Sequence, residues 1–193
     1  MIDFYEKNHE KYFHSTVEIN PGSFLTPLTR FLHSGASILD IGCGSGRDLL
    51  WLRQHGFSPT GFERSPGLAR LANQHSSCPV IEGDFQNYDF SSLSFDALIC
   101  IGSLVHLSRG SLKSTITTVS QALKENGYIL LTFKEGQGTS QFSDDRIFTL
   151  WSREDLENIF SPCGMVTVDF TRVVSKLRAE DTWLGFVIRK VHG

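Results

Sequence analysis

The chain has few cysteines, and none of them are spaced as metal ligands. Its 193 residues include four, and Cys43, Cys78, Cys100 and Cys163 form no C-x2-C pair of the kind that binds zinc. Scattered cysteines of this sort are typical of small, reduced core residues in a cytoplasmic protein. We therefore expect no disulfide framework and no metal site.

Long apolar runs are also lacking. The longest uncharged apolar stretch, residues 97–105, is about half the length that a membrane-spanning helix needs. The first ten residues include Asp3, Glu6 and Lys7 and have no apolar segment of the kind found in secretory leaders. These absences predict a cytoplasmic protein without membrane association.

Charge of one sign does not dominate the sequence either. Lysine and arginine number 18 and aspartate and glutamate 21, for a formal net charge of −3. Without a basic run, a protein that resides on DNA or RNA is disfavoured, although brief contact with tRNA stays open. The length corresponds to about one domain, so we expect one domain over residues 1–193, as a monomer or homodimer.

Short apolar runs alternate with segments of helical period, as in an α/β fold with a mostly parallel sheet. The predicted strands are 37–41, 58–63, 79–82, 95–101, 127–134, 165–172 and 183–189. The predicted helices between them are 47–55, 66–75, 111–124 and 153–160. A polar connection without helical period makes the last two strands an antiparallel pair, and residues 1–33 predict one or two helices.

A glycine-rich loop is the most informative motif. In residues 38–48 a short hydrophobic strand leads into Gly42, Gly44 and Gly46 and then into a helix. Such a loop lets a ligand lie against bare main chain at a helix N-terminus. The P-loop lysine is missing, and the third glycine comes one residue too early for the dinucleotide fingerprint. The remaining class is the G-x-G-x-G loop that holds the amino-acid end of S-adenosylmethionine.

Several motifs in order resemble the class I S-adenosylmethionine-dependent methyltransferases over roughly residues 36–134. Asp40-Ile-Gly-Cys-Gly-Ser-Gly46 is similar to the first motif of that family. Glu63 stands where the family has an acidic residue that accepts hydrogen bonds from both ribose hydroxyls. Gly83-Asp84-Phe85 resembles the adenine-binding segment, and the strand ending at Ile101 resembles the one that borders the transferred methyl group.

This resemblance implies a Rossmann-like α/β fold: a seven-stranded sheet, mostly parallel with an antiparallel last strand, and helices on both faces. It implies S-adenosylmethionine as cofactor, S-adenosylhomocysteine as product, an N-terminal helical lid (1–35), a cofactor-binding core (36–134) and an acceptor-side loop with closing strands (135–193). The implied cofactor-binding residues are Asp40, Gly42, Cys43, Gly44, Gly46, Glu63, Arg64, Asp84, Phe85 and Ile101. A loop cap at Asp40, a solvated charge at Glu63 and an ordinary turn at Asp84 remain open alternatives.

The acceptor side is less defined. The residues after Ile101 lack the tetrapeptide of DNA amino methyltransferases, and Pro162-Cys163 lies on the wrong element for a cytosine-C5 nucleophile. A small metabolite is therefore favoured over a nucleic-acid base. His106 is a candidate general base or a histidine bonded to backbone. Tyr12 is a candidate contact to cofactor or acceptor, with Tyr5 second, or both are packing residues of an amphipathic helix.

Three further residues have two interpretations each. Lys134 and Arg146 either bind an acidic acceptor or are surface charges, and Trp183 is either a core residue or a wall of the acceptor pocket. The predicted function is transfer of a methyl group to an oxygen, nitrogen or sulfur of a small metabolite. Alternatives are a protein side chain as acceptor, an NAD(P)-dependent oxidoreductase and a non-catalytic cofactor-binding module.

Overall fold

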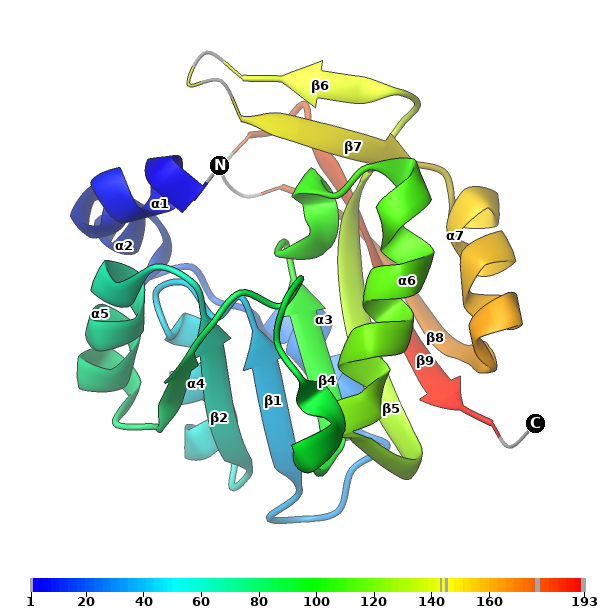
Figure 1. The fold of residues 1–193 in the computed structure, drawn as a ribbon, viewed down its shortest axis with the longest axis horizontal. Helices are drawn as coiled ribbons and strands as arrows, with labels where there is room; N and C mark the ends of the chain where they lie inside the picture. Colours follow the sequence, from blue (N-terminus) through cyan, green and yellow to red (C-terminus); the bar gives the residue numbers. More distant parts are fainter. Residues whose placement is uncertain (1, 143, 145, 176–177, 192–193) are drawn as a thin grey trace.

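A twisted nine-stranded sheet organises the described part of the chain, which comprises residues 2–142, 144, 146–175 and 178–191 of a computed structural model (Figure 1). The strands are β1 Ser37–Ile41, β2 Ser58–Glu63, β3 Val80–Glu82, β4 Phe95–Ile101, β5 Leu123–Glu135, β6 Thr139–Gln141, β7 Ile147–Trp151, β8 Met165–Val174 and β9 Thr182–Lys190. The predicted Rossmann-like α/β fold is confirmed.

The order of the parallel strands creates the site. β1 pairs with β2 and with β4, so the chain runs outward through β3 and then returns to the other side of β1. In α/β sheets ligands bind at such a switch point, beyond the carboxyl ends of the strands. The glycine loop leaves β1 at this point, and the segment that contains His106 leaves β4 beside it.

The far edge of the sheet is antiparallel, as predicted. β9 pairs with β5 and β8 with β9, both antiparallel. The prediction of seven strands missed two, because β6 and β7 form a short hairpin in the segment interpreted as a loop. β7 also pairs in parallel with the last two residues of β5, beyond the end of β4. These two strands form because they pair with each other and β7 pairs with β5. Local periodicity does not reveal such pairing.

Helices cover both faces of the sheet. They are α1 Ile2–Lys7, α2 His9–Thr16, α3 Gly22–Thr29, α4 Arg47–Gln54, α5 Pro66–Ser76, α6 Arg109–Val119 and α7 Arg153–Phe160. In Figure 1, α6 lies in front of the sheet and α3 and α4 lie behind it. One apolar cluster joins α6 and α7 to the sheet, and a second joins α3 and α4 to its other face. None of the described helices is both long and apolar enough to cross a bilayer.

The N-terminal segment contains three described helices, whereas one or two were predicted. Residues 17–21 separate α2 from α3, and Leu25 and Leu28 of α3 are fully buried against the sheet. α1 and α2 lie instead above α5, at the end of the sheet where the parallel strands terminate (Figure 1). Only the first two helices are therefore placed over the switch point, and a lid role for residues 1–35 stays a prediction.

Candidate functional site

Two neighbouring cavities lie beyond the carboxyl ends of the strands. The glycine-loop cavity, of about 380 Å³, lies over β1, β2 and β4 and is lined by Gly42, Glu63 and Asp84, among others. The acceptor-side cavity, of about 250 Å³, lies over β5 and β9 and is lined by Lys134 and Trp183, among others. Both cavities share the same four residues, which are Tyr5, Tyr12, Ile101 and Gly102. Two ligands, one in each cavity, would therefore meet at these four residues.

Most of the predicted site residues come together in the glycine-loop cavity. Those that line it are Tyr12, Gly42, Gly44, Glu63, Arg64, Asp84, Phe85, Ile101 and His106. Asp40, Cys43 and Gly46 do not line it. Asp40 lies in β1, and Cys43 and Gly46 lie in the loop, where they contribute to its shape and packing.

The glycines allow the loop to be approached closely. Gly42, Gly44 and Gly46 all have positive φ, at 78°, 53° and 73°, a region that favours glycine. A Cβ added at Gly42 would lie 2.5 Å from Cβ of Ser103, on the segment after β4. A Cβ at Gly46 would lie 2.8 Å from the backbone of Ala72 in α5. Gly42 therefore allows the two loops of the switch point to meet, and Gly46 allows the first turn of α4 to pack on α5.

Cys43 has a packing role in this structure. Its side chain is 6% exposed and packs with Leu49, Ala72 and Cys78 behind the loop. Burial raises the pKa of its thiol well above the ordinary value. The Cys43 side chain therefore packs behind the loop, and an added Cβ at Gly46 would meet α5. Binding of the cofactor by the main chain at these two residues stays a prediction.

Glu63 ties the glycine loop to the end of β2. One carboxylate oxygen accepts a hydrogen bond from the backbone N–H of Gly44 at 3.0 Å. The other accepts from the N–H groups of Arg64 and Ser65 at 2.8 and 2.9 Å. Burial raises the pKa of this carboxyl, and the three N–H donors oppose the rise. At 7% exposure, Glu63 is not a solvated strand-end charge, so that alternative is excluded.

Asp40 is a buried carboxylate with an unused acceptor. It is 1% exposed, and its Oδ2 has no hydrogen-bond partner among the described residues. Burial raises the pKa of this carboxyl well above the ordinary value, and repulsion from Asp48 adds to the rise. Buried acceptors are nearly always paired in folded proteins. Oδ2 of Asp40 is therefore one of the few unsatisfied buried polar atoms among the described residues.

The ends of β2 and β3 form the opposite wall of the glycine-loop cavity. Arg64 Nη1 lies 3.4 Å from Oδ2 of Asp84, and the other oxygen of Asp84 accepts from the N–H of Gln86 at 3.0 Å. Phe85 packs partly against the core. An acidic side chain and an aromatic ring thus flank one end of the cavity.

His106 is held in one tautomer by two contacts. Its Nδ1 lies 2.7 Å from the carbonyl oxygen of Ile147, and a carbonyl only accepts, so Nδ1 carries the proton. Its Nε2 lies 2.8 Å from the hydroxyl of Tyr5 and accepts from it in the neutral ring. Burial lowers the pKa of His106 below the ordinary 6.5. His106 thus makes the backbone bond of the second interpretation, and its Nε2 faces the Tyr5 hydroxyl. A role of His106 as general base stays a prediction.

Removal of the Tyr5 hydroxyl should change the pKa of His106, because the two groups are in contact. The Tyr5 O–H donates to neutral Nε2 and so stabilises the neutral ring. We expect Tyr5→Phe to raise the pKa of His106 toward 6.5, measured by NMR titration of its ring protons. Tyr88→Phe is the control, because its ring packs on Phe62 and Phe90, away from His106. An unchanged His106 titration in Tyr5→Phe would contradict this assignment.

The first two helices are fastened over the site by side chains. Glu6 accepts hydrogen bonds from the hydroxyl of Ser65 at 2.5 Å and from the N–H of Gly67 at 3.1 Å, at the start of α5. This places the rings of Tyr5 and Tyr12 edge to face, with centroids 5.1 Å apart. Burial raises the pKa of both phenols. Tyr12 lines both cavities, and its contact with a cofactor or acceptor stays a prediction.

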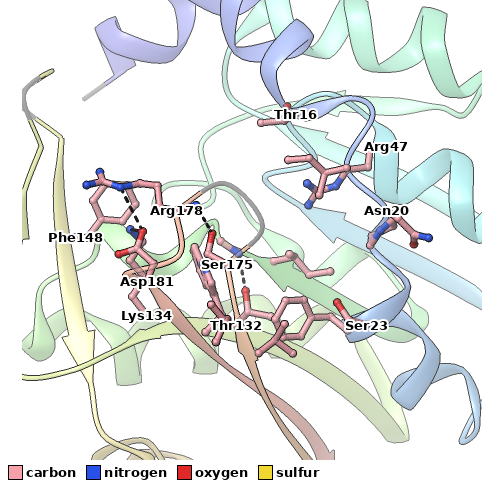
Figure 2. Close-up of a pocket in the computed structure, with 18 of the residues that line it drawn as sticks. Thr16, Asn20, Ser23, Arg47, Thr132, Lys134, Phe148, Ser175, Arg178 and Asp181 are labelled. Carbon is pink, nitrogen blue, oxygen red and sulfur yellow. Dashed lines mark hydrogen bonds and ion pairs between the residues drawn. The ribbon is translucent and has the colours of Figure 1, made fainter.

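The acceptor-side cavity contains residues that the sequence left ambiguous. Figure 2 shows Lys134, Phe148, Arg178 and Asp181 grouped on one side and Thr16, Asn20 and Arg47 on the other. Lys134 is 5% exposed, so it is not a surface charge, and Trp183 forms part of the cavity wall. Phe148 and Asp181 were missed, because only the β6–β7 hairpin and the β9 register bring them here. Within the described residues, no group of three His, Cys, Asp or Glu is placed to hold a metal.

A solved structure has the same fold over nearly the whole chain. The structure of 1,6-didemethyltoxoflavin-N1-methyltransferase from Burkholderia thailandensis, solved with 1,6-didemethyltoxoflavin and S-adenosylhomocysteine, is similar with a TM-score of 0.80 at 21% identity, covering 98% of this chain and 86% of that one. The chain therefore has the same Rossmann-like fold as that methyltransferase.

Sequence comparisons extend this likeness. Residues 38–127 match the family described as "Methyltransferase domain", in agreement with the predicted resemblance. A putative methyltransferase of Geobacillus sp. (strain WCH70) is 26% identical over 141 residues, 69% of this chain and 57% of that protein. A ubiquinone biosynthesis O-methyltransferase of Xanthomonas euvesicatoria is 27% identical over 120 residues, 59% and 49% of the two chains. The chain spans about half the length of the curated relatives it matches.

Proposed function

We propose that this protein transfers a methyl group from S-adenosylmethionine to an oxygen, nitrogen or sulfur atom of a small metabolite. The observation that carries the proposal is the meeting of two cavities at Tyr5, Tyr12, Ile101 and Gly102. Methyl transfer is an in-line displacement, so donor and acceptor must be held end to end with water excluded. Two joined cavities under a pair of helices provide this arrangement.

The residues of the glycine-loop cavity fit the cofactor. Gly42 and Gly44 leave the main chain bare, and the carboxylate of Glu63 suits a ribose diol. Asp40 does not line the cavity, but its unpaired Oδ2 leaves an acceptor two residues before Gly42. Asp84 and Phe85 would hold the adenine end. When bound, S-adenosylmethionine supplies an electrophilic methyl group on a sulfonium. Several of the similar structures contain S-adenosylmethionine or S-adenosylhomocysteine, which supports this choice.

The acceptor is small and gives up its proton toward His106. The acceptor-side cavity, at about 250 Å³, is below the roughly 300–1,000 Å³ usual for drug-sized ligands. A proton released by an O–H, N–H or S–H acceptor passes to the hydroxyl of Tyr5, which gives its own proton to Nε2 of His106. Because this requires neutral His106, we expect kcat to fall as the pH drops below the pKa of that ring. A kcat that stays flat across the pH range in which His106 itself titrates, as followed by NMR on the same protein, would exclude His106 as base.

The first experiment is calorimetric titration with S-adenosylmethionine, S-adenosylhomocysteine and NADH in parallel. Micromolar binding of the first two without NADH binding is the expected result. Binding of NADH alone would overturn the proposal in favour of an oxidoreductase. Tight binding of S-adenosylmethionine without turnover on a broad metabolite panel would favour a non-catalytic module, and methylation of a protein panel alone would favour a protein acceptor.

A further inference from the structure

A lysine is buried in the wall of the acceptor-side cavity, although methyl transfer itself needs no cation there. Lys134 follows Leu130 and Thr132 on one face of β5, because alternate residues of a strand share a face. Leu130 packs among Leu25 and Leu28 of α3, and the cavity begins just beyond this packing, at Thr132 and Lys134. The Lys134 ammonium therefore projects into the cavity from its floor (Figure 2).

Aromatic rings surround this ammonium. Nζ of Lys134 lies 4.3 Å from the ring centroid of Phe142, 4.5 Å from that of Phe148 and 5.7 Å from that of Trp183. These are cation–π distances, and all three rings line the cavity. Burying an ammonium is unfavourable unless partners compensate, and an apolar side chain would complete the wall at lower cost. The lysine is thus better explained by a ligand than by packing.

Among the described residues, Asp181 is the one carboxylate that pairs with Lys134, and it leaves N–H donors of the ammonium unused. Nζ lies 2.5 Å from Oδ2 of Asp181, and an ammonium has three N–H donors. Asp181 itself has a second cation nearby, because Nε of Arg178 is 3.9 Å from the same oxygen. The Asp181 carboxylate therefore already has two cationic neighbours, whereas the Lys134 ammonium can still donate to a second anionic group.

Most of the charged side chains that line the acceptor-side cavity are positive, like Lys134. The charged side chains that line it are Arg47, Lys134, Arg146, Arg178 and Asp181. Of these, only Asp181 is acidic. The carboxylates that pair with the three arginines, on Asp48, Asp144 and Glu180, are not part of the described lining. A cavity lined mostly by cations favours an anionic ligand over a cationic one.

We propose that the methyl acceptor is an aromatic acid: a planar ring system with a carboxylate or another acidic group. Its anionic group binds Lys134 in place of, or beside, Asp181, and its ring lies against Phe148 and Trp183. This inference rests on the proposed function, because it assigns the acceptor-side cavity to the acceptor. Planar rings stack well on aromatic side chains, which matches the composition of the wall.

Three probes with one ring system and different charges test the proposal. We would titrate 2-naphthoate, 2-naphthamide and 2-naphthylmethylamine into the protein saturated with S-adenosylhomocysteine, by calorimetry. The expected order places the carboxylate at least tenfold tighter than the amide, with the amine weakest. Preferred binding of the amine, or no binding of any probe at millimolar concentration, would overturn the proposal.

Variants locate the effect at Lys134. Lys134→Met is expected to abolish the preference for the carboxylate over the amide, and Asp181→Asn to strengthen naphthoate binding severalfold by freeing the ammonium. Lys124→Met is the matched control, since Lys124 lies on the same strand in a comparable pair with Asp96 at 2.8 Å but is exposed and outside the cavity. If Lys134→Met fails to fold, Asp181→Asn alone decides. Unchanged preferences in the folded variants would refute the site.

Failure of this proposal can be separated from failure of the proposed function. S-adenosylhomocysteine binding is measured before any probe is added. If it binds and the naphthyl series shows no charge preference, the methyltransferase proposal stands and the aromatic-acid acceptor is refuted. If it does not bind, but naphthoate binds the free protein in a manner dependent on Lys134, the anion site stands and the methyltransferase proposal fails.

Discussion

Replacing Glu63 with alanine should raise the dissociation constant for S-adenosylhomocysteine by about 10- to 100-fold, equivalent to roughly 1.4–2.8 kcal/mol. Two effects add. The carboxylate is lost as an acceptor for the ribose, and the N–H groups of Gly44, Arg64 and Ser65 lose the acceptor that shapes the loop. Calorimetry on the purified variant measures the change.

The neighbouring strand offers a matched control for Glu63. Glu82 is the register partner of Glu63 on β3 but is exposed, so Glu82→Ala should leave cofactor binding unchanged. Equal affinity of Glu63→Ala and Glu82→Ala would remove Glu63 from the site. A comparison of both variants also separates a local loss of charge from a loss of loop geometry.

The stability of Glu63→Ala depends on pH in a defined direction. Burial raises the pKa of Glu63 above its ordinary 4.5, so the folded state holds the proton more tightly than the unfolded state. The Glu63 contribution to the free energy of unfolding therefore decreases as the pH rises through the window from 4.5 up to the raised pKa. Denaturant titrations of wild type and Glu63→Ala at pH 4.5 and 7 should show the variant losing more stability at the lower pH. A larger loss at pH 7 would contradict the raised pKa.

Gly42→Ala is expected to lower the free energy of unfolding by about 2–5 kcal/mol and to abolish cofactor binding. A left-handed residue with a Cβ costs roughly 1–2 kcal/mol, and overpacking costs about 1–3 kcal/mol more. The second term applies because the new Cβ would lie 2.5 Å from Cβ of Ser103. Since that contact joins the loops after β1 and β4, relief of the clash would displace one wall of the glycine-loop cavity.

Gly35→Ala separates the two costs. Gly35 has the same φ of 78° as Gly42 but has nothing within 4 Å of an added Cβ. Its substitution should cost only the backbone term, roughly 1–2 kcal/mol, and leave binding intact. Denaturant unfolding and titration with S-adenosylhomocysteine measure both quantities. Equal stability losses in the two variants would mean that close approach at Gly42 is unimportant.

Local signals predicted the frame of this protein well. β1, β2 and β4 have the predicted bounds, as does α7 with its Ser152–Asp155 capping box. Each of these elements is specified by its own apolar period and by the residues at its ends. The hairpin of β6 and β7 was missed because its strands are short and gain their stability from pairing with each other and with β5. The separation of α3 from the first two helices likewise follows from packing on the sheet.

The sequence by itself determined the parallel core, the glycine loop, the acidic residue at the end of β2 and the resemblance to methyltransferases. These features reside in contiguous residues, where spacing alone carries the chemistry. Only the tertiary structure decided what lies opposite them. It paired His106 with Tyr5 across 101 positions, left Oδ2 of Asp40 unpaired and buried Lys134 against Asp181. Such contacts depend on which strand ends meet at the switch point. No local sequence pattern predicts contacts between residues so far apart in the chain.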